Sequence, residues 1–524
     1  MKRNKVYVVI LTIINIILSF LMILEVFFFR SLIDHALLKV SIKKDIIIII
    51  STIVGMVVLR FFFLFLRNKY NLSLEMELKK KLFSSLYKAQ YQSLMRLHSS
   101  KVLSLYLDDI KNISETKSYV IPQLVSQISR IVFAFLALIK LNYFVVLGLS
   151  VVGALMFIFS ATYGKYVKGL NKKVLSSNDR LNCYLDESYQ NLRFLHVMAE
   201  EQTIINKTDF EFEKNYKIKN RRNNLQVITN TFVTSAMLVL YGAVMCYSAY
   251  LITKDRITYG TLTALVSLVS YFEAPFSQLG TLISRFALFG ASKLRINEIL
   301  SLKCEINDNS IVDFDKISLE DISFSYGDRK IFNHFNLEIN KNDIISIKGP
   351  SGVGKTTLLN ILLGFYNVKG NAYVSLEDKK YRISGSTRSL FSYVPQENIL
   401  FSGSIRDNFR MLDENIKDDE IKEALIRAGI YNEIEDKGGI SYQLFEGGKG
   451  LSVGQIQRIL IAIALVKKRP ILIMDEFSSA LDKKNENEIV KMLKDLNQTI
   501  IFVSHRDLDI NARVIDLEEL NENN

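Results

Sequence analysis

Residues 349–356 read Gly-Pro-Ser-Gly-Val-Gly-Lys-Thr, a full match to the phosphate-binding loop pattern G-x-x-x-x-G-K-[ST]. The apolar run Asp343–Lys348 before it predicts a short strand, and Thr356–Leu363 after it predicts a helix. In that context the glycines let backbone N–H groups surround a phosphate at a helix N-terminus. We therefore expect an α/β nucleotide-binding domain, with ATP ligands in this loop at Gly349, Ser351, Gly352, Gly354, Lys355, Thr356 and Thr357.

A second motif of this domain places two carboxylates at the end of a strand. The apolar run Ile471–Asp475 is typical of a buried parallel strand, and Glu476 follows it directly. We expect Lys355 to reach the β- and γ-phosphates and Thr356 to ligate Mg²⁺, with Asp475 in the Mg²⁺ shell through water. Glu476 is then placed to orient and deprotonate the attacking water. A solvated turn is the alternative for two adjacent acids, and the phosphate loop upstream disfavours it.

The first 290 residues carry most of the apolar excess of this 524-residue chain. Apolar residues make up 49% of the sequence and the mean hydropathy is +0.17, although 23% of the residues are charged. Six runs carry at most one charge each and are long enough to cross a hydrocarbon core about 30 Å thick at about 1.5 Å per residue. Buried helices of soluble proteins are rarely apolar on every face over such lengths. We expect six membrane spans, at about 6–29, 46–66, 118–139, 141–164, 227–253 and 257–284.

A secretory signal peptide is the alternative for the first apolar run. Its apolar core is far longer than the usual length of about 7–15 residues, and no small-residue cleavage site follows it. We therefore expect an uncleaved span. Because that span begins at residue 6, we also expect no N-terminal peptidase domain that would trim a leader from a cargo.

The distribution of Lys and Arg predicts the orientation in the membrane. Basic residues concentrate at the N-terminus and in the long loops after the second and fourth spans, whereas the alternate loops are short. Both termini and the nucleotide-binding domain are therefore expected in the cytoplasm, on the side where ATP is found. The net charge of +12 is explained by anionic headgroups of the lipid bilayer, so we expect no nucleic-acid partner. Three cysteines lie far apart without metal or redox spacing, so we expect reduced structural thiols: Cys183, Cys246 and Cys304.

The loops after the second and fourth spans are much longer than a helix connection requires. Both keep apolar residues at helical spacing among their charges. We expect the spans to continue as helices beyond the bilayer and to return through short elbows, which would contact the ATPase. The segment Glu187–Phe194 is the candidate for the second elbow, and a solvated loop is the alternative.

Leu451-Ser-Val-Gly-Gln455 resembles the signature of ABC ATPases, and the whole chain resembles an ABC exporter half-transporter. The resemblance implies an α-helical polytopic membrane domain over residues 1–300 and a linker over 301–313. An α/β P-loop ABC ATPase domain would then occupy 314–524. The signature departs from the family pattern at its third position, Val453, where the family has glycine. A β-branched residue there could slow closure of the site.

The resemblance also implies roles for residues outside the phosphate loop. Tyr326 would stack on adenine, Gln396 would ligate Mg²⁺ and respond to the membrane domain, and His505 would contact the γ-phosphate. Catalytic roles thus fall to Glu476, His505 and Gln396, and the cofactors are ATP and Mg²⁺. The remaining ATP contacts implied by the family pattern are Ser452, Gly454, Gln455 and Asp482.

A chain with one phosphate loop and one signature must pair, since in this family the signature of one subunit completes the phosphate loop of the other. This chain retains Glu476, His505, Gln396 and Lys355, so two copies would make two competent sites. We therefore expect a homodimer. A heterodimer with a paralogous half-transporter is the less favoured alternative, because such pairs more often show one degenerate set.

Ionisable residues inside membrane spans are costly and indicate either a substrate pathway or an internal pair. Four are candidates: Glu25, Arg60, Arg130 and Glu273. Glu273 lies beside Pro275, which can kink the sixth span, and we expect it to line the cavity. Snorkelling toward the interface or pairing between helices is the alternative for each residue.

Together these features predict an ATP-driven exporter of an amphipathic or peptide-like substrate across the cell membrane. An acidic mid-membrane residue with apolar walls would suit a hydrophobic or cationic peptide, a drug or a lipid. A multidrug or lipid exporter is the nearest alternative. A membrane-bound ATP sensor that transports nothing is disfavoured by Glu476 and His505, and an importer or a soluble ABC ATPase by the fused spans.

Overall fold

The computed structural model describes residues 2–95, 97, 99–198, 201–305, 311–504, 506 and 508–522. It divides into two units. The helical unit comprises Met1–Lys88 and Met95–Leu302, and the α/β unit comprises Ala89–Leu94 and Lys303–Asn524. The short segment Ala89–Leu94 therefore belongs with the α/β unit, although it lies between two helices of the other unit.

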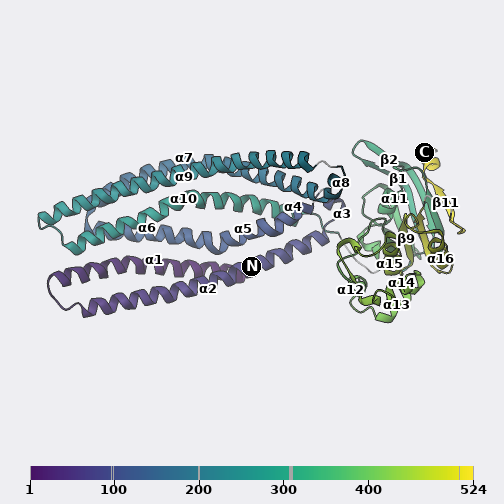
Figure 1. Ribbon diagram of the computed structural model, residues 1–524, viewed down its shortest axis with the longest axis horizontal. Helices are drawn as coiled ribbons and strands as arrows, with labels where there is room; N and C mark the ends of the chain where they lie inside the picture. Colours follow the sequence, from purple (N-terminus) through teal and green to yellow (C-terminus); the bar gives the residue numbers. More distant parts are fainter. Residues whose placement is uncertain are drawn as a thin grey trace. The chain divides into compact units, whose positions relative to one another are not determined.

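Long helices make up the helical unit (Figure 1). Two of them begin at side-chain caps: Asn142 accepts hydrogen bonds from the N–H groups of Phe144 and Val145, and Thr258 accepts one from Thr261. The long helices are α1 Lys2–Leu37, α2 Lys43–Lys88, α6 Ile121–Leu141, α7 Tyr143–Gln190, α9 Glu201–Thr253 and α10 Tyr259–Leu300.

Four helical stretches are long and apolar enough to cross a membrane, among the residues that the structure describes. The predicted fourth and sixth spans, 141–164 and 257–284, begin two residues before α7 and α10 and otherwise lie in these helices, where several side chains fall outside the described part. A helical membrane domain is therefore confirmed, and the count of six spans stays a prediction. The four stretches are Val6–Leu37, Lys43–Lys88, Ser99–Leu141 and Glu201–Thr253.

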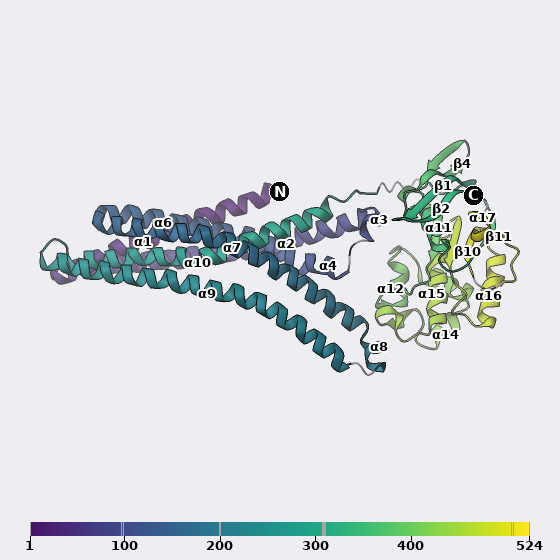
Figure 2. The ribbon, with the colours of Figure 1, turned by 90° about the horizontal axis from the view of Figure 1, so that it is seen from above.

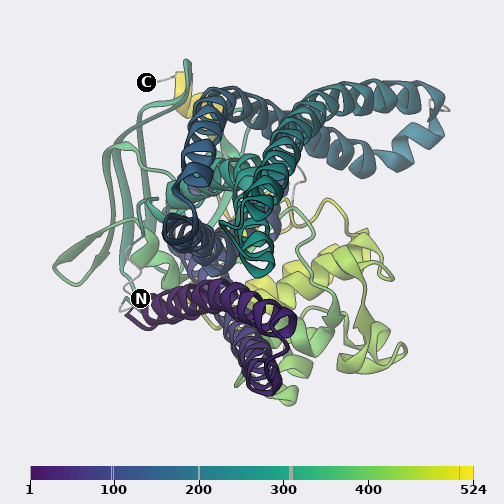
Figure 3. The same cartoon turned by 90° about the vertical axis from the view of Figure 1, so that its left-hand side faces the viewer.

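The helices extend well past their apolar portions, as predicted from the long loops. Helices α7 and α9 run side by side and diverge from α1, α6 and α10 toward the short helix α8, Leu192–Val197 (Figures 2 and 3). The predicted elbow Glu187–Phe194 covers the end of α7 and the start of α8. Before α6 the chain forms a series of short helical segments: α4 Ser99–Ser104, the π-helical η1 Leu105–Asp109, α5 Ile110–Glu115 and the π-helical η2 Thr116–Val120.

A parallel five-stranded sheet forms the centre of the α/β unit, with strand order β11-β3-β10-β9-β6. Alternate residues of its strands enter two different apolar clusters: Ile471 and Ile473 of β9 enter one, Leu472 and Met474 the other. The sheet is therefore buried on both faces, which explains its continuous apolar strands. Its strands are β3 Ile344–Lys348, β6 Phe391–Val394, β9 Ile471–Asp475, β10 Thr499–Val503 and β11 Arg513–Asp516.

A second, antiparallel sheet has the order β2-β1-β4-β5. Apolar and polar residues alternate over 317–326, a pattern that predicts an antiparallel strand at a sheet edge. The antiparallel strand is confirmed, but the edge position is wrong, since β1 pairs with β2 and with β4. Alternating apolar residues indicate that one face of a strand is buried. They do not indicate whether one strand or two pair with it through backbone hydrogen bonds. The strands are β1 Lys316–Tyr326, β2 Arg329–Asn340, β4 Lys369–Leu376 and β5 Lys379–Arg382.

Helices cover the parallel sheet and complete the α/β unit. Helix α11, Lys355–Leu362, follows β3 directly, so the predicted strand–loop–helix order is confirmed. The other helices are α3 Tyr91–Leu94, α12 Ile405–Arg410, α13 Asp418–Arg427, α14 Tyr431–Glu435, α15 Val453–Val466, α16 Lys483–Lys494 and α17 Leu517–Glu522. Short segments β7 Gly403–Ser404, β8 Gln443–Leu444 and the 3₁₀ turns η3 Gly385–Leu390, η4 Gly439–Ser441 and η5 Glu446–Gly448 join them.

Candidate active site

The phosphate loop turns from β3 into α11 through glycines whose backbone no other residue fits. Gly354 has φ +117°, and a Cβ placed there would lie 2.7 Å from the side chain of Ile331 and 3.1 Å from that of Phe332. The Lys355 ammonium bends back over the loop and donates to the carbonyl oxygens of Gly349 at 2.8 Å and Pro350 at 3.2 Å. The loop thus presents a buried cation beside a helix N-terminus, the arrangement that binds phosphate.

An arginine that the motif did not predict also contacts this loop. Arg329, at the start of β2, donates from Nη2 to the carbonyl oxygen of Gly352 at 3.1 Å. It adds a second positive charge beside the loop from a different sheet. The sequence holds no signal for it, because its position depends on how the two sheets pack.

Four predicted residues meet at the carboxyl end of the parallel sheet. The Thr356 hydroxyl donates to Asp475 Oδ2 at 3.4 Å, and Gln396 Nε2 donates to Glu476 Oε2 at 2.6 Å. The backbone N–H of Glu476 donates to Val503 O at 3.1 Å. Thr356 lies in the first turn of α11, after β3 and the phosphate loop, while Gln396 follows β6 and the acid pair lies at the end of β9. The parallel order of the sheet brings these strand ends together.

Glu476 adopts a left-handed backbone conformation, with φ +48°. For a residue other than glycine this costs on the order of 1–3 kcal/mol, and such costs concentrate at functional sites. The two carboxylates of this turn have different surroundings. Asp475 is buried at the end of β9, whereas Glu476 accepts a hydrogen bond from Gln396. The paired acids are therefore part of an ordered site, and the alternative of a solvated turn is excluded for Asp475.

The electrostatics of the acid pair suit a divalent cation. Burial raises the pKa of Asp475, and the neighbouring Glu476 charge raises it further, while the Thr356 hydroxyl opposes the shift. A cation would offset both effects. Hydroxyl and carboxylate oxygens are the ligands Mg²⁺ prefers, and it needs only one or two carboxylates because it retains several waters. The adjacent oxygens of Thr356 and Asp475 therefore fit the predicted Mg²⁺ site.

Tyr326 ends β1 with 44% of its side chain exposed. Its hydroxyl donates to that of Tyr366 at 2.9 Å, and its ring packs edge-on against Phe324 and Tyr366. The polar tip and one edge are thereby fixed, so the ring is held rigidly with exposed area for stacking on a base. This geometry supports the predicted adenine contact.

The signature segment forms the N-terminus of α15. Ser452 caps the helix in a reciprocal pair with Gln455: Gln455 N–H donates to Ser452 Oγ, and Ser452 N–H to Gln455 Oε1. A Cβ at Gly454 would lie 2.9 Å from the carbonyl oxygen of Ala480, so only glycine fits. Val453 points outward and is 68% exposed. Its side chain therefore changes the outer surface of the signature without disturbing its packing.

A buried arginine of α15, Arg458, stabilises the signature helix, and the sequence analysis did not predict this role. Arg458 donates to Glu433 at 2.7 Å and to the Gly429 carbonyl at 2.7 Å, and Gln455 donates to Glu433 at 2.6 Å. Burial alone would raise the pKa of Glu433, but the bonds from Gln455 and Arg458 lower it. Asp482 caps α16 by accepting from the Asn485 N–H at 2.8 Å. The signature helix is thus held in place by hydrogen bonds and an ion pair within the same α/β unit.

His505 lies outside the described residues, so its predicted contact with the γ-phosphate stays a prediction. The described strand before it, β10, ends at Val503 and pairs with β3 and β9, the strands that lead into the phosphate loop and the acid pair.

The first elbow is part of the α/β unit. The Tyr91 ring of α3 lies 4.4 Å from the Phe365 ring, and the Tyr91 N–H donates to Glu305 Oε1 at 3.3 Å. Arg388 holds Glu305 in a two-pronged ion pair, at 2.5 and 3.0 Å, and stacks on the Phe365 ring at 4.3 Å. The segment between α2 and α4 is therefore fixed to the ATPase fold by aromatic and ionic contacts, as predicted for an elbow.

Replacing Arg388 with Ala should weaken this attachment. The change removes a charge-assisted pair and a cation–π contact, which together stabilise by about 1–3 kcal/mol at a partly exposed site. We expect stimulation of ATP hydrolysis by transported substrate to fall at least about threefold, with basal hydrolysis less affected. The measurement is ATPase rate with and without substrate in nanodiscs. Arg427→Ala, which breaks the exposed pair with Glu423, is the control, and equal loss in both variants would contradict the role.

The predicted pathway residues separate into two cavities of the helical unit. Arg60 and Arg130 line one of about 600 Å³, while Glu25 lines another of about 380 Å³ beside Tyr271. Glu273 lines neither of these two, so its place in the pathway stays a prediction.

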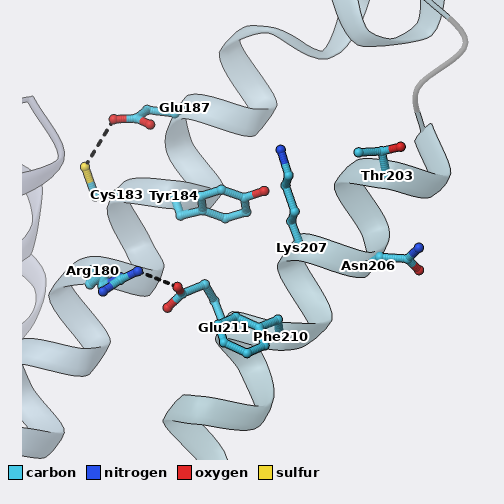
Figure 4. Close-up of a pocket in the computed structure, with 9 residues that line it drawn as sticks. All are labelled: Arg180, Cys183, Tyr184, Glu187, Thr203, Asn206, Lys207, Phe210 and Glu211. Atoms are coloured by element: carbon cyan, nitrogen blue, oxygen red, sulfur yellow. Dashed lines mark hydrogen bonds and ion pairs between the residues drawn. The ribbon is translucent and has the colours of Figure 1, made fainter.

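A third cavity, of about 720 Å³, lies between the ends of α7 and α9 (Figure 4). An ion pair between Arg180 and Glu211 at 2.6 Å crosses it, and the Cys183 thiol donates to Glu187 at 3.6 Å. The Arg180–Glu211 pair is neutral as a whole, and Lys207 and Glu187 also line the cavity.

Comparisons with known proteins agree with the geometry of both units. The family described as "ABC transporter transmembrane region" matches residues 8–276, and the family described as "ABC transporter" matches residues 332–479. A protein of Rickettsia felis described as an export ATP-binding/permease protein is 30% identical over 96% of this chain and 90% of its own length. An ATP-dependent lipid A-core flippase of Desulfotalea psychrophila is 27% identical, over 91% and 86%. A lactococcin-A transport/processing ATP-binding protein of Lactococcus lactis is 30% identical over 70% of this chain and 52% of its own.

Proposed function

This chain belongs to the ABC transporter family and is an ATP-hydrolysing exporter, and we propose that it moves an amphipathic or peptide-like substrate out of the cytoplasm as a homodimer. One observation carries the proposal. The phosphate loop, the acid pair and Gln396 gather at one edge of the parallel sheet, in a chain whose other unit consists of long apolar helices.

The proposed chemistry assigns one role to each group at this edge. Lys355 and the N–H groups of the phosphate loop hold the β- and γ-phosphates, and Tyr326 stacks on the adenine. Glu476, oriented by Gln396, accepts the proton of the attacking water. Mg²⁺ held by Thr356 and Asp475, with Gln396, would neutralise charge on the phosphates. His505 is proposed as a further contact to the γ-phosphate.

The position of the signature supports the proposed homodimer. Gln455 bonds to Glu433 and to Ser452, and Gly454 lies close to the Ala480 carbonyl, while Val453 at the N-terminus of α15 is exposed. A helix N-terminus attracts phosphate, so the signature of a second copy can close over ATP bound at the loop of the first. ATP then binds the closed pair more tightly than the open one, and hydrolysis releases it. The elbows transmit that motion to the membrane helices.

The names of the relatives suggest two substrate classes, peptides and lipids. The Lactococcus lactis protein carries a lactococcin name, and the Desulfotalea psychrophila protein is named a lipid A-core flippase. A lipid or multidrug exporter is therefore the second candidate. A sensor that transports nothing is disfavoured, because Glu476 and Gln396 form an intact catalytic pair. We place the protein in the cell membrane as a multi-pass protein with both termini in the cytoplasm.

Cross-linking between two singly substituted chains tests the shared site. In a background with Cys183, Cys246 and Cys304 replaced by Ser, one chain carries Ser351→Cys in the phosphate loop and the other Val453→Cys in the signature. We expect a disulfide-linked dimer on mild oxidation with ATP only when both chains are mixed, because each cysteine faces the other motif across the interface. Each chain alone is the control. Equal dimer in the single-variant samples, or none in the mixture, would refute the arrangement.

A further inference from the structure

The 600 Å³ cavity of the helical unit has an unusual lining for a membrane-embedded space. It lies between α1, α2, α6 and α10, and three arginines line it, Arg60, Arg67 and Arg130, without any carboxylate in the lining. Predicted depth places it in the half of the spans nearest the cytoplasm. Charged groups persist in such places only when something compensates them.

The arginines have no acidic partner within the described part of the chain. Arg67 stacks on the Tyr119 ring at 4.7 Å, and no ion pair of the described side chains includes Arg60, Arg67 or Arg130. One acid, Glu115, lines an adjacent cavity of about 240 Å³ together with Arg67, and it pairs with Arg285 at 3.9 Å. The cavity therefore carries net positive charge even after the neighbouring acid is counted.

Polar groups of α6 and α10 also remain available within the cavity. Gln278 accepts from Gln123 at 2.8 Å and from Gln127 at 3.1 Å, which fixes the two amides of α6. Gln127 is 94% buried, and among the described residues neither its Oε1 nor the buried Nε of Arg130 has a hydrogen-bond partner. Buried groups without partners are costly, so these positions indicate a ligand that bonds with them.

Apolar side chains complete the lining on the α1 and α2 sides. Leu18, Met22, Met56, Val57, Phe63 and Leu64 share the cavity with the arginines. A charged end and an apolar wall in one space of this volume match a molecule that has both a polar head and a hydrocarbon part.

We propose that this cavity binds the anionic head of an amphiphile, a phosphate or carboxylate on a lipid-like molecule, between Arg60, Arg67 and Arg130. Guanidinium groups donate to such oxygens in pairs, and the apolar wall accommodates the first part of the tail. The proposal rests on the exporter function and narrows its substrate class. It also narrows the expectation drawn from Glu273, which suited a hydrophobic or cationic peptide, a drug or a lipid, and it disfavours the cationic peptide.

Binding to the full-length chain without ATP tests the cavity independently of transport. The chain is placed in phosphatidylcholine nanodiscs, and binding of labelled oleoyl-lysophosphatidic acid is compared with that of oleoyl-lysophosphatidylcholine, oleate and inorganic phosphate. We expect the two anionic amphiphiles to bind at least about tenfold more tightly than the zwitterionic one, because each charge-assisted bond contributes strongly. Inorganic phosphate should bind far more weakly, since it lacks a tail.

Charge removal in the cavity supplies the decisive comparison. Arg60→Gln combined with Arg130→Gln should weaken binding of the anionic amphiphiles at least about tenfold and leave the zwitterionic one within about twofold. Arg130→Lys, which keeps the charge, should retain most of the preference. Arg222→Gln, at a partly exposed arginine of α9 that bonds to Asn223 and does not line this cavity, is the matched control and should change nothing. Retained ATP binding by each variant checks that the chain has folded.

Several outcomes would overturn the proposal. They are equal binding of anionic and zwitterionic amphiphiles, tight binding of inorganic phosphate alone, or stronger binding of a cationic amphipathic Lys/Leu peptide. The first would mean that a second copy of the chain neutralises the arginines. Failure of the exporter function looks different: anionic amphiphiles would still bind and depend on Arg130, but vesicles would show no ATP-dependent transport.

Discussion

Glu476→Gln should abolish ATP turnover while the protein still binds ATP. General-base catalysis contributes about 10²–10⁴-fold, and an amide cannot accept the proton from the attacking water. The structure favours a clean effect, because the new amide oxygen can still accept the hydrogen bond from Gln396 that now ends on Glu476 Oε2 at 2.6 Å. The measurement is phosphate release in nanodiscs, with ATP affinity determined in parallel.

The matched control is Glu423→Gln on the exposed face of α13. It makes the same chemical change in the same unit, at a surface pair with Arg427 that contributes at most about 1 kcal/mol. We expect its turnover to equal that of the unaltered chain. Unchanged hydrolysis in Glu476→Gln would remove Glu476 as the base and leave Asp475 or a bound water to be considered.

Gly454→Ala should reduce ATP hydrolysis by about 100-fold, although it adds one methyl group. The added Cβ would lie 2.9 Å from the Ala480 carbonyl, so α15 and the segment leading to Asp482 must move apart. A displacement of about 1 Å at a catalytic group is sufficient for a loss of that size. ATP binding by the phosphate loop of the same chain should persist, because Lys355 and Gly354 lie elsewhere. The readout is turnover together with ATP-induced cross-linking between Ser351→Cys and Val453→Cys chains.

The neighbouring position provides the contrast. Val453→Gly restores the residue found at this position in the family and removes an exposed side chain, so packing within the chain is undisturbed. We expect turnover to stay the same or to rise by a few fold, as the partner's phosphates come closer to the helix N-terminus. A loss as large as that of Gly454→Ala would show that both positions act through helix stability, not through the approach of two chains.

Much of this architecture was predictable because its signals are local. The phosphate loop carries its own strand and helix, and the acid pair follows a strand whose apolar run is continuous, so Lys355, Thr356 and Asp475 could be assigned together. The edge position of residues 317–326 was wrong, since side-chain alternation does not report hydrogen-bonded neighbours. Arg329 and Arg458 were missed because each acts through a backbone carbonyl or an acid far away in the chain.

The 600 Å³ cavity also combines features with a local sequence signal and features that depend on residues far apart in the chain. Gln123, Gln127 and Arg130 recur at helical spacing in an otherwise apolar span, a polar stripe that could have been recognised from period alone. Gln278, which bonds to the two glutamines, lies more than 150 positions away, so no pattern within one span could indicate that these residues share a cavity with Arg60.

The order of residues was sufficient to specify an apolar helical part, a phosphate loop and the acids beside it, because backbone geometry and hydrocarbon thickness act over a few neighbouring residues. The packing of distant helices was needed to establish which charges face one another. Tertiary packing brought Tyr91 and Arg388 to the same ring, Phe365, and it placed three arginines in one cavity whose described lining holds no acid. The electrostatic energy of two charged side chains depends on the distance between them in space. In a helical bundle that distance is fixed only when the helices pack against one another, because packing sets the rotation of each helix about its axis.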